Sequence, residues 1–214
     1  MKFMTKIVLL LITCPTLASF TLPSYEASYK IEYRGNTIGS HSESLGYENK
    51  NSYILKSKSQ FQILWFHGEL STTTKGKIHH SRFQASSHTL KKGDKIASFY
   101  QLKNRANDLA SAVLNCRCNL IQRKTTCSQL IKFDSKNNPT RVKINLKTLS
   151  HRIISTKKHN FKTVKIKFLS RNSVITYWLA KNIYFIPVKV SIDRNGKNFT
   201  QVLTSYRFMH TTKM

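Results

Sequence analysis

Three cysteines lie close together in the sequence, and their thiols are the side chains best suited to do chemistry. Cys116, Cys118 and Cys127 fall within twelve positions. In an oxidising compartment such a group forms a disulfide, so we expect Cys118–Cys127 or Cys116–Cys127 to close a short loop, stabilising the fold by about 2–3 kcal/mol. The third thiol is then left to be buried or to link two chains. A redox role is the weaker interpretation, because the chain has no Cys-x-x-Cys motif.

Histidine could add a metal ligand to these sulfurs, and His79 and His80 are the adjacent pair to consider. Thiols of an exported protein tend to oxidise, and Lys77 and Arg82 beside the pair would repel a cation. We therefore interpret both histidines as surface residues. The sequence predicts no metal site and no cofactor.

Motifs of common enzyme classes are missing from the sequence. There is no Gly-x-Ser-x-Gly nucleophile motif and no glycine-rich phosphate loop. Only nine Asp and Glu occur, and no spacing pairs them as acid and base. Asp108 is most simply a helix N-cap. We expect a protein that is not an enzyme.

Aromatic residues offer a different kind of site. In a half-closed sheet they could line a cavity for a lipid or another apolar ligand, as in ligand-carrying barrels. The alternative is that they fill the core. The candidates are Trp65, Phe66, Tyr177, Trp178 and Phe185.

The charge of the chain is strongly positive. It carries 36 Lys and Arg against 9 Asp and Glu, a formal net charge of +27. Lysine outnumbers arginine by 26 to 10, whereas reading of bases or phosphates favours arginine. We expect no specific nucleic-acid partner. The charge instead favours docking on an anionic membrane surface, an envelope polymer or a partner protein, unless it only reflects the coding bias of the source.

The first eighteen residues indicate export. Lys2 and Lys6 precede an apolar run, and Thr16-x-Ala18 fits the small-residue cleavage rule. We predict a signal peptide at residues 1–18, with cleavage after Ser19 as the alternative, and a periplasmic location. Acylation of Cys14 is a minor alternative, which would make the chain a lipoprotein.

The remaining residues, 19–214, are expected to form a single domain dominated by strands. Hydrophobic residues make up 40% of the chain, enough for a core. A period of two predicts about ten strands, and capping residues predict one short helix at 107–114. Such a chain forms a curved antiparallel sheet, an open barrel or a sandwich. The predicted strands are 25–33, 38–47, 52–60, 62–73, 82–90, 95–102, 128–133, 141–146, 161–169, 173–180, 186–192 and 199–208.

Four short motifs, in order, resemble those of the bacterial exported family of unknown function DUF3108, over residues 24–206. They are Tyr25-Glu26-Ala27-Ser28-Tyr29 with Tyr33-x-Gly35-x-x-Ile38-Gly39; Asp108-Leu109-x-Ser111-Ala112; Phe161-Lys162-Thr163-Val164-Lys165 with Tyr177-Trp178-Leu179-Ala180; and Tyr184-x-Ile186-Pro187-Val188-Lys189-Val190. The resemblance implies an envelope protein with a curved sheet and no assigned activity. The high charge and the cysteine cluster depart from the family pattern. We expect a half-barrel that holds an apolar ligand or, alternatively, a basic interaction module.

Overall fold

The computed structural model describes seven stretches of the chain. They are residues 21–63, 66–102, 106–132, 140–145, 151–156, 159–170 and 173–209. The predicted signal peptide at 1–18, the loop expected at 134–139 and Trp65 lie outside them. Within the described residues, no helix is long and apolar enough to cross a membrane.

The described residues form thirteen strands, one α-helix and a short 3-10 turn. The strands before the helix are β1 (Tyr25–Tyr33), β2 (Asn36–Asn49), β3 (Ser52–Ile63), β4 (Phe66–His79), β5 (Arg82–Lys92) and β6 (Lys95–Gln101). The helix is α1 (Leu109–Ile121). The elements that follow are β7 (Thr126–Ile131), β8 (Thr140–Asn145), β9 (His151–Ser155), β10 (Asn160–Ser170), β11 (Ser173–Ala180), η1 (Lys181–Ile183), β12 (Ile186–Arg194) and β13 (Lys197–Phe208).

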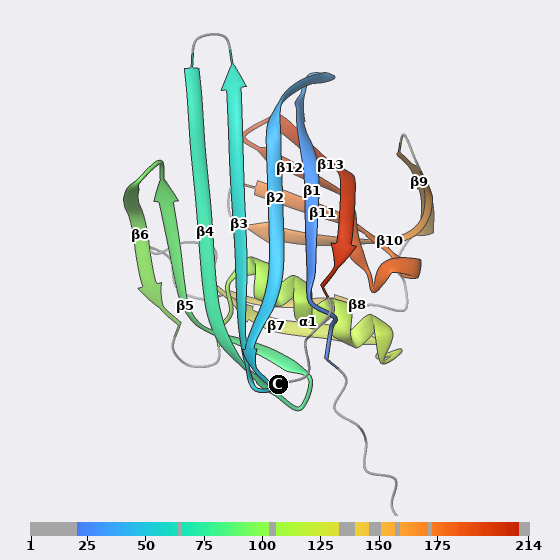
Figure 1. Ribbon diagram of the computed structural model, residues 1–214. Coiled ribbons are helices and arrows are strands. Elements are labelled where there is room, and N and C mark those ends of the chain that lie inside the picture. Colours follow the sequence, from blue (N-terminus) through green and yellow to red (C-terminus); the bar gives the residue numbers. More distant parts are fainter. Residues whose placement is uncertain are drawn as a thin grey trace, which may run out of the picture.

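Eleven of these strands form one curled antiparallel sheet. Its order is β6-β5-β4-β3-β2-β1-β13-β12-β11-β10-β9, so β6 and β9 are its two edges and the barrel stays open. Figure 1 shows β1 to β4 on one side of the molecule and β10 to β12 behind them. The predicted class, a mainly β chain with a curved, unclosed antiparallel sheet, is confirmed.

The core lies where α1 packs on the inner face of this sheet. On β1 the side chains alternate, and Tyr25 and Tyr29 are buried on the inner face. Leu114 of α1 packs in their cluster, whereas Val113 packs on the other side of the helix with Phe168 of β10. The helix therefore fills the space between the two halves of the sheet. The hairpin β7–β8 forms a separate two-stranded sheet beside it.

Both hairpin turns predicted from the sequence are present. Arg34 and Gly35 have φ angles of 50° and 83°, and Asn195 and Gly196 have φ angles of 51° and 75°. Left-handed backbone at both central positions is the type I′ turn that matches the twist of two antiparallel strands. Pro187 lies beside a register shift in the β11–β12 pairing, where its missing N–H is tolerated, as expected.

Three element predictions are wrong. The boundary expected between the strands 52–60 and 62–73 is misplaced, since β3 continues to Ile63 and β4 begins at Phe66. No Gly or Pro stands between them to mark a reversal. The helix expected at 107–114 continues to Ile121, because its polar residues are buried by partners distant in sequence. The edge strand β9 is not predicted at all, so the described residues form thirteen strands against twelve predicted ranges and an expected total of about ten.

Candidate functional site

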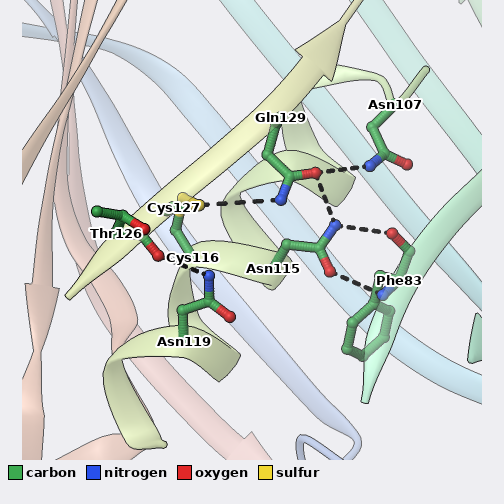
Figure 2. The surroundings of a disulfide bond; sticks show 8 residues. All are labelled: Phe83, Asn107, Asn115, Cys116, Asn119, Thr126, Cys127 and Gln129. Atoms are coloured by element: carbon green, nitrogen blue, oxygen red, sulfur yellow. Dashed lines mark hydrogen bonds between the residues drawn. A yellow bond between two sulfur atoms is a disulfide. The ribbon is translucent and has the colours of Figure 1, made fainter. Parts of the chain in front are cut away.

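The three predicted cysteines form one disulfide and one buried thiol. Cys116 of α1 is bonded to Cys127 of β7, which is one of the two expected pairings (Figure 2). Cys118 is free and buried. Burial raises the pKa of its thiol to about 12. The disulfide therefore fixes the helix to the small sheet, and the third thiol is a core residue.

The predicted cavity residues do not share one surface. Tyr177 points to the inner face of β11 and meets Phe168 edge to face, with ring centroids 5.8 Å apart. Trp178, the next residue, points to the opposite face. Phe185 is half-buried against the core at the start of β12. Phe66 begins β4, its side chain lies outside the described atoms, and Trp65 lies outside the described residues.

Trp178 is the centre of a cationic row on the outer face of the sheet. Lys165 of β10 and Lys189 of β12 stand directly opposite it in the two neighbouring strands. Their ammonium nitrogens lie 5.6 Å and 5.3 Å from the indole ring, within cation–π range. We call Lys165, Trp178 and Lys189 the basic–aromatic row. Partial desolvation, with Lys167 and Arg152 nearby, lowers the pKa of Lys165.

Apolar side chains extend this face toward the β10–β11 turn. Leu169 and Val174 pair across the two strands, and the alternation of side chains puts both on the face of the basic–aromatic row. They are 64% and 36% exposed. Asp193 of β12 is opposite Val174 and is the one acidic side chain that the strand pairing places there. Residues 109–214 as a whole carry 21 Lys and Arg against two Asp.

A second cationic feature is a cleft beside the disulfide. Its volume is about 630 Å³, and it lies between the β4–β5 turn, α1 and β7. We call it the polar cleft. It is lined by His79, His80, Ser81, Arg82, Gln84, Asn107, Asn115, Asn119, Lys124, Ser128 and Gln129.

Three buried amides form the floor of the polar cleft. Asn115 accepts a hydrogen bond from the Phe83 N–H and donates one to the Phe83 carbonyl (Figure 2). Asn107 accepts from the Ala85 N–H. Both amides also donate to the Gln129 Oε1. The two asparagines therefore satisfy backbone groups of β5 where β6 does not reach, since β6 pairs only with residues 87–92.

The rim of the polar cleft carries the charge. His79, His80, Arg82 and Lys124 are exposed, as the sequence predicts for the two histidines. His80 and Ser81 have φ angles of 49° and 62°, so both central residues of the β4–β5 turn are left-handed without being glycine. Such backbone costs on the order of 1 kcal/mol per residue and persists where the surroundings hold it.

Buried polar groups at the start of α1 hold the helix in the sheet. Asp108 accepts hydrogen bonds from the Ser111 N–H and the Thr74 hydroxyl, and it lies 3.2 Å from the His88 ring nitrogen. Burial acts to raise the pKa of Asp108, but its contacts with His88, Ser111 and Thr74 outweigh this and lower it. The predicted N-cap is confirmed. The contacts from β4 and β5 are long-range pairings without a local sequence signal.

A buried arginine fixes the middle of α1. Arg117 donates from Nε to the Tyr184 carbonyl and from Nη1 to the Tyr25 hydroxyl, which in turn donates to Glu43. Its guanidinium also lies 4.7 Å from the Tyr25 ring centroid. Burial, above all, raises the pKa of Tyr25 well above its usual value. This network joins the helix to β1, β2 and the loop before β12, and we interpret it as structural.

The polar cleft is the candidate site that the sequence does not indicate. Asn107, Asn115 and Gln129 carry no motif, and the rim histidines were interpreted only as surface residues. The local signal that was available is Asn-Cys and Cys-Ser-Gln around the two bonded cysteines. The close spacing of Cys116 and Cys127 implied that their neighbours would share one surface.

Comparisons with known proteins identify the fold alone. No known family profile matches the chain, and no curated protein matches it. The crystal structure of a β-barrel-like protein of the domain of unknown function DUF1849 from Brucella abortus is similar, with a TM-score of 0.58 and 9% identity. The match covers 90% of this chain and all of that one. A structure of PNGF-II overlaps at a TM-score of 0.37 with 10% identity, over 89% of this chain and 29% of the other. The chain thus shares a β-barrel-like fold with a protein of unknown function.

Proposed function

We propose that this chain is an exported, non-enzymatic protein that docks on an anionic lipid surface through the outer face of β10 to β12. The observation that carries the proposal is the basic–aromatic row with Leu169 and Val174 beside it. Trp, Lys and exposed aliphatic side chains on one face are typical of a membrane-interface contact.

Each part of this face has a physical role in docking. Lysines near an anionic surface contribute roughly 1 kcal/mol each, and the attraction extends over about a Debye length. The indole ring of Trp178 holds both ammonium groups on one face by cation–π contact, which keeps their charges together for an anionic surface. Leu169 and Val174 gain free energy by leaving water at roughly 25 cal/mol per Å² of apolar surface. A soluble polyanion would use only the first of these contributions, so a lipid surface is the better fit.

The envelope location rests on separate observations. The signal peptide predicted at residues 1–18 and the motifs that resemble DUF3108 both favour export. The Cys116–Cys127 disulfide is compatible with an oxidising compartment. The 9% identity to the DUF1849 protein adds nothing to this argument beyond the fold.

The docking hypothesis takes precedence over an apolar ligand cavity because of where the predicted aromatics lie. Tyr177 and Phe185 pack against one core cluster, and Trp178 points to the opposite face of β11 and packs against another. Trp178 instead lies between two lysines on the outer face, where it is partly buried and its indole N–H is covered.

Binding to lipid vesicles tests the proposal. We expect the chain to co-sediment with vesicles of phosphatidylglycerol and phosphatidylcholine, and not with pure phosphatidylcholine. The double variant Lys165→Gln, Lys189→Gln should bind about 30-fold more weakly, since two lysines at about 1 kcal/mol each are lost. The matched control Lys77→Gln, Lys91→Gln removes two exposed lysines from β4 and β5 and should change binding less than threefold.

Equal losses in the two double variants would overturn the proposal, because net charge alone would then explain binding. So would equal affinity for dextran sulfate in solution, which carries charge without an interface. Circular dichroism of each variant establishes that the sheet is intact.

A further inference from the structure

We propose that the polar cleft binds a small sugar that carries a phosphate or a carboxylate. This inference goes beyond docking, since the cleft lies between the β4–β5 turn, α1 and β7 and contains no residue of the basic–aromatic row. Its volume of about 630 Å³ is within the range of pockets that hold small molecules.

The charge of the lining selects an anion. Arg82 and Lys124 are cationic, His79 and His80 can add charge, and none of the eleven lining residues is acidic. Arginine gives two parallel N–H donors to a carboxylate or phosphate. A hollow lined by one sign of charge also focuses the field, which raises the local concentration of an oppositely charged ligand.

The floor holds a donor that lacks a good acceptor. Gln129 is 4% exposed, and its Oε1 is already used by Asn107 and Asn115. Within the described part of the chain, its Nε2 donates to the Cys127 sulfur at 4.0 Å, which is a weak acceptor (Figure 2). A buried donor left in this state costs about 1–3 kcal/mol, so a ligand oxygen at the floor would gain from meeting it.

Acceptors in the lining favour a ligand with hydroxyl groups rather than a bare anion. Asn119 donates from its Nδ2 to the Thr126 carbonyl, and no described residue donates to its side-chain Oδ1, which can accept from a ligand. The hydroxyls of Ser81 and Ser128 can donate or accept. A sugar presents hydroxyls that both donate and accept, which suits this mixed lining.

The walls of the cleft are held in place before any ligand arrives. The disulfide fixes α1 to β7, and Asn115 fixes α1 to β5. The β4–β5 turn is the informative wall. Three other tight hairpin turns place a glycine at a left-handed position: Gly35 between β1 and β2, Gly93 between β5 and β6, and Gly196 between β12 and β13. The β4–β5 turn keeps His80 and Ser81 at such positions instead. Both residues line the cleft. The strained backbone is therefore accompanied by two side chains that a ligand can contact, which glycine would not supply.

Calorimetry with glucose 6-phosphate as the probe tests the site. We expect the full chain to bind it, and to bind glucose or inorganic phosphate at least tenfold more weakly. The double variant Arg82→Gln, Lys124→Gln should lose at least tenfold in affinity, and His80→Gln should lose less. Both residues changed in the double variant are exposed, so the fold should survive. The control Lys77→Gln, Lys91→Gln should bind as the unchanged chain does.

Three results would overturn the inference: no binding of the probe, equal binding by the Arg82 and Lys124 variant, or equal affinity for inorganic phosphate. The last would mean that only the charge is recognised. Vesicle binding by the Arg82 and Lys124 variant should be unchanged. Failure at the cleft is thus separable from failure of the docking proposal, which depends on Lys165 and Lys189.

Discussion

The basic–aromatic row and the polar cleft are both cationic, yet they hold their charge in opposite ways. Lys165 and Lys189 stand on an open sheet face, and their partner is the ring of Trp178 between them. Arg82 and Lys124 stand on the rim of a hollow whose floor is made of hydrogen-bonded amides. The row therefore presents charge to a broad surface, whereas the cleft encloses a small volume.

This difference has consequences for how each region depends on the rest of the fold. The sheet face needs only regular strand pairing, which many local contacts support. The cleft needs α1, β5 and β7 in one arrangement, which one disulfide and a few side chains maintain. We expect the cleft to be lost under mild perturbation and the row to survive it.

Removal of the disulfide is the strongest way to separate the two regions. The double variant Cys116→Ala, Cys127→Ala opens a link between residues 11 positions apart, which should lower the free energy of unfolding by about 3 kcal/mol. Urea unfolding measures this change. Glucose 6-phosphate affinity should fall with it, while the folded variant still binds anionic vesicles.

The informative control is Cys118→Ala, which removes a buried thiol but no bond. It should cost about 1 kcal/mol and leave the cleft intact. If the double variant keeps full affinity for glucose 6-phosphate, the disulfide does not shape the cleft.

Replacement of Trp178 by Leu is the opposite perturbation. It removes the ring that lies between two ammonium groups but keeps an apolar side chain in place. We expect vesicle binding to weaken about tenfold, since the ring that holds both ammonium groups on one face is lost. Affinity for glucose 6-phosphate should not change. If Trp178→Leu leaves vesicle binding unchanged, the two lysines alone account for the contribution of the basic–aromatic row to binding.

The sequence predicts the strands of this fold better than its sites, for a physical reason. Apolar and polar residues alternate with a period of two in 25–33 and 186–192, because alternate side chains of one strand are buried. This pattern lies within a single segment, so the sequence of that segment is enough to predict the strand. The polar cleft depends on Asn115 meeting Phe83 across 32 residues, and on Gln129 meeting both asparagines. Apart from the two bonded cysteines beside Asn115 and Gln129, no local sequence pattern indicates these pairings.

The disulfide and the site around Trp178 are predicted in part. The spacing of the cysteines predicts two alternative disulfides, Cys116–Cys127 and Cys118–Cys127. It does not distinguish them, because the pairing depends on which side of α1 faces β7. Composition singled out Trp178 as an aromatic candidate. Only the register of β10, β11 and β12 brings Lys165 and Lys189 beside it.

Lowering the pH should disturb the polar cleft before the basic–aromatic row, because Asp108 holds the start of α1. Its folded-state pKa lies below the usual value of 3.8, so the stability it adds is present above about pH 3.8 and is lost as pH falls through the lower value. Asp108→Asn should cost about 1 kcal/mol at pH 7 and flatten unfolding free energy against pH below 4. Unchanged pH dependence in the variant would assign the acid response to other carboxyl groups.

The smallest expected effect concerns the strained turn at the cleft rim. Ser81→Gly relieves a left-handed residue at φ 62°, a gain of about 1 kcal/mol that is offset by the greater freedom of glycine in the unfolded chain. The net change in unfolding free energy should stay within about 0.5 kcal/mol. Affinity for glucose 6-phosphate should nevertheless fall about two- to threefold, because a hydroxyl of the lining is lost.

The matched change is Gly196→Ser in the β12–β13 turn, where φ is 75°. It introduces the same kind of strain at a place that lines neither the cleft nor the row, so stability should fall by about 1 kcal/mol while both binding activities stay unchanged. Together the two variants ask whether left-handed backbone at Ser81 serves a ligand or only closes a hairpin. If Ser81→Gly leaves glucose 6-phosphate affinity unchanged, the turn only closes a hairpin, and the affinity of the cleft rests on Arg82, Lys124 and the amide floor.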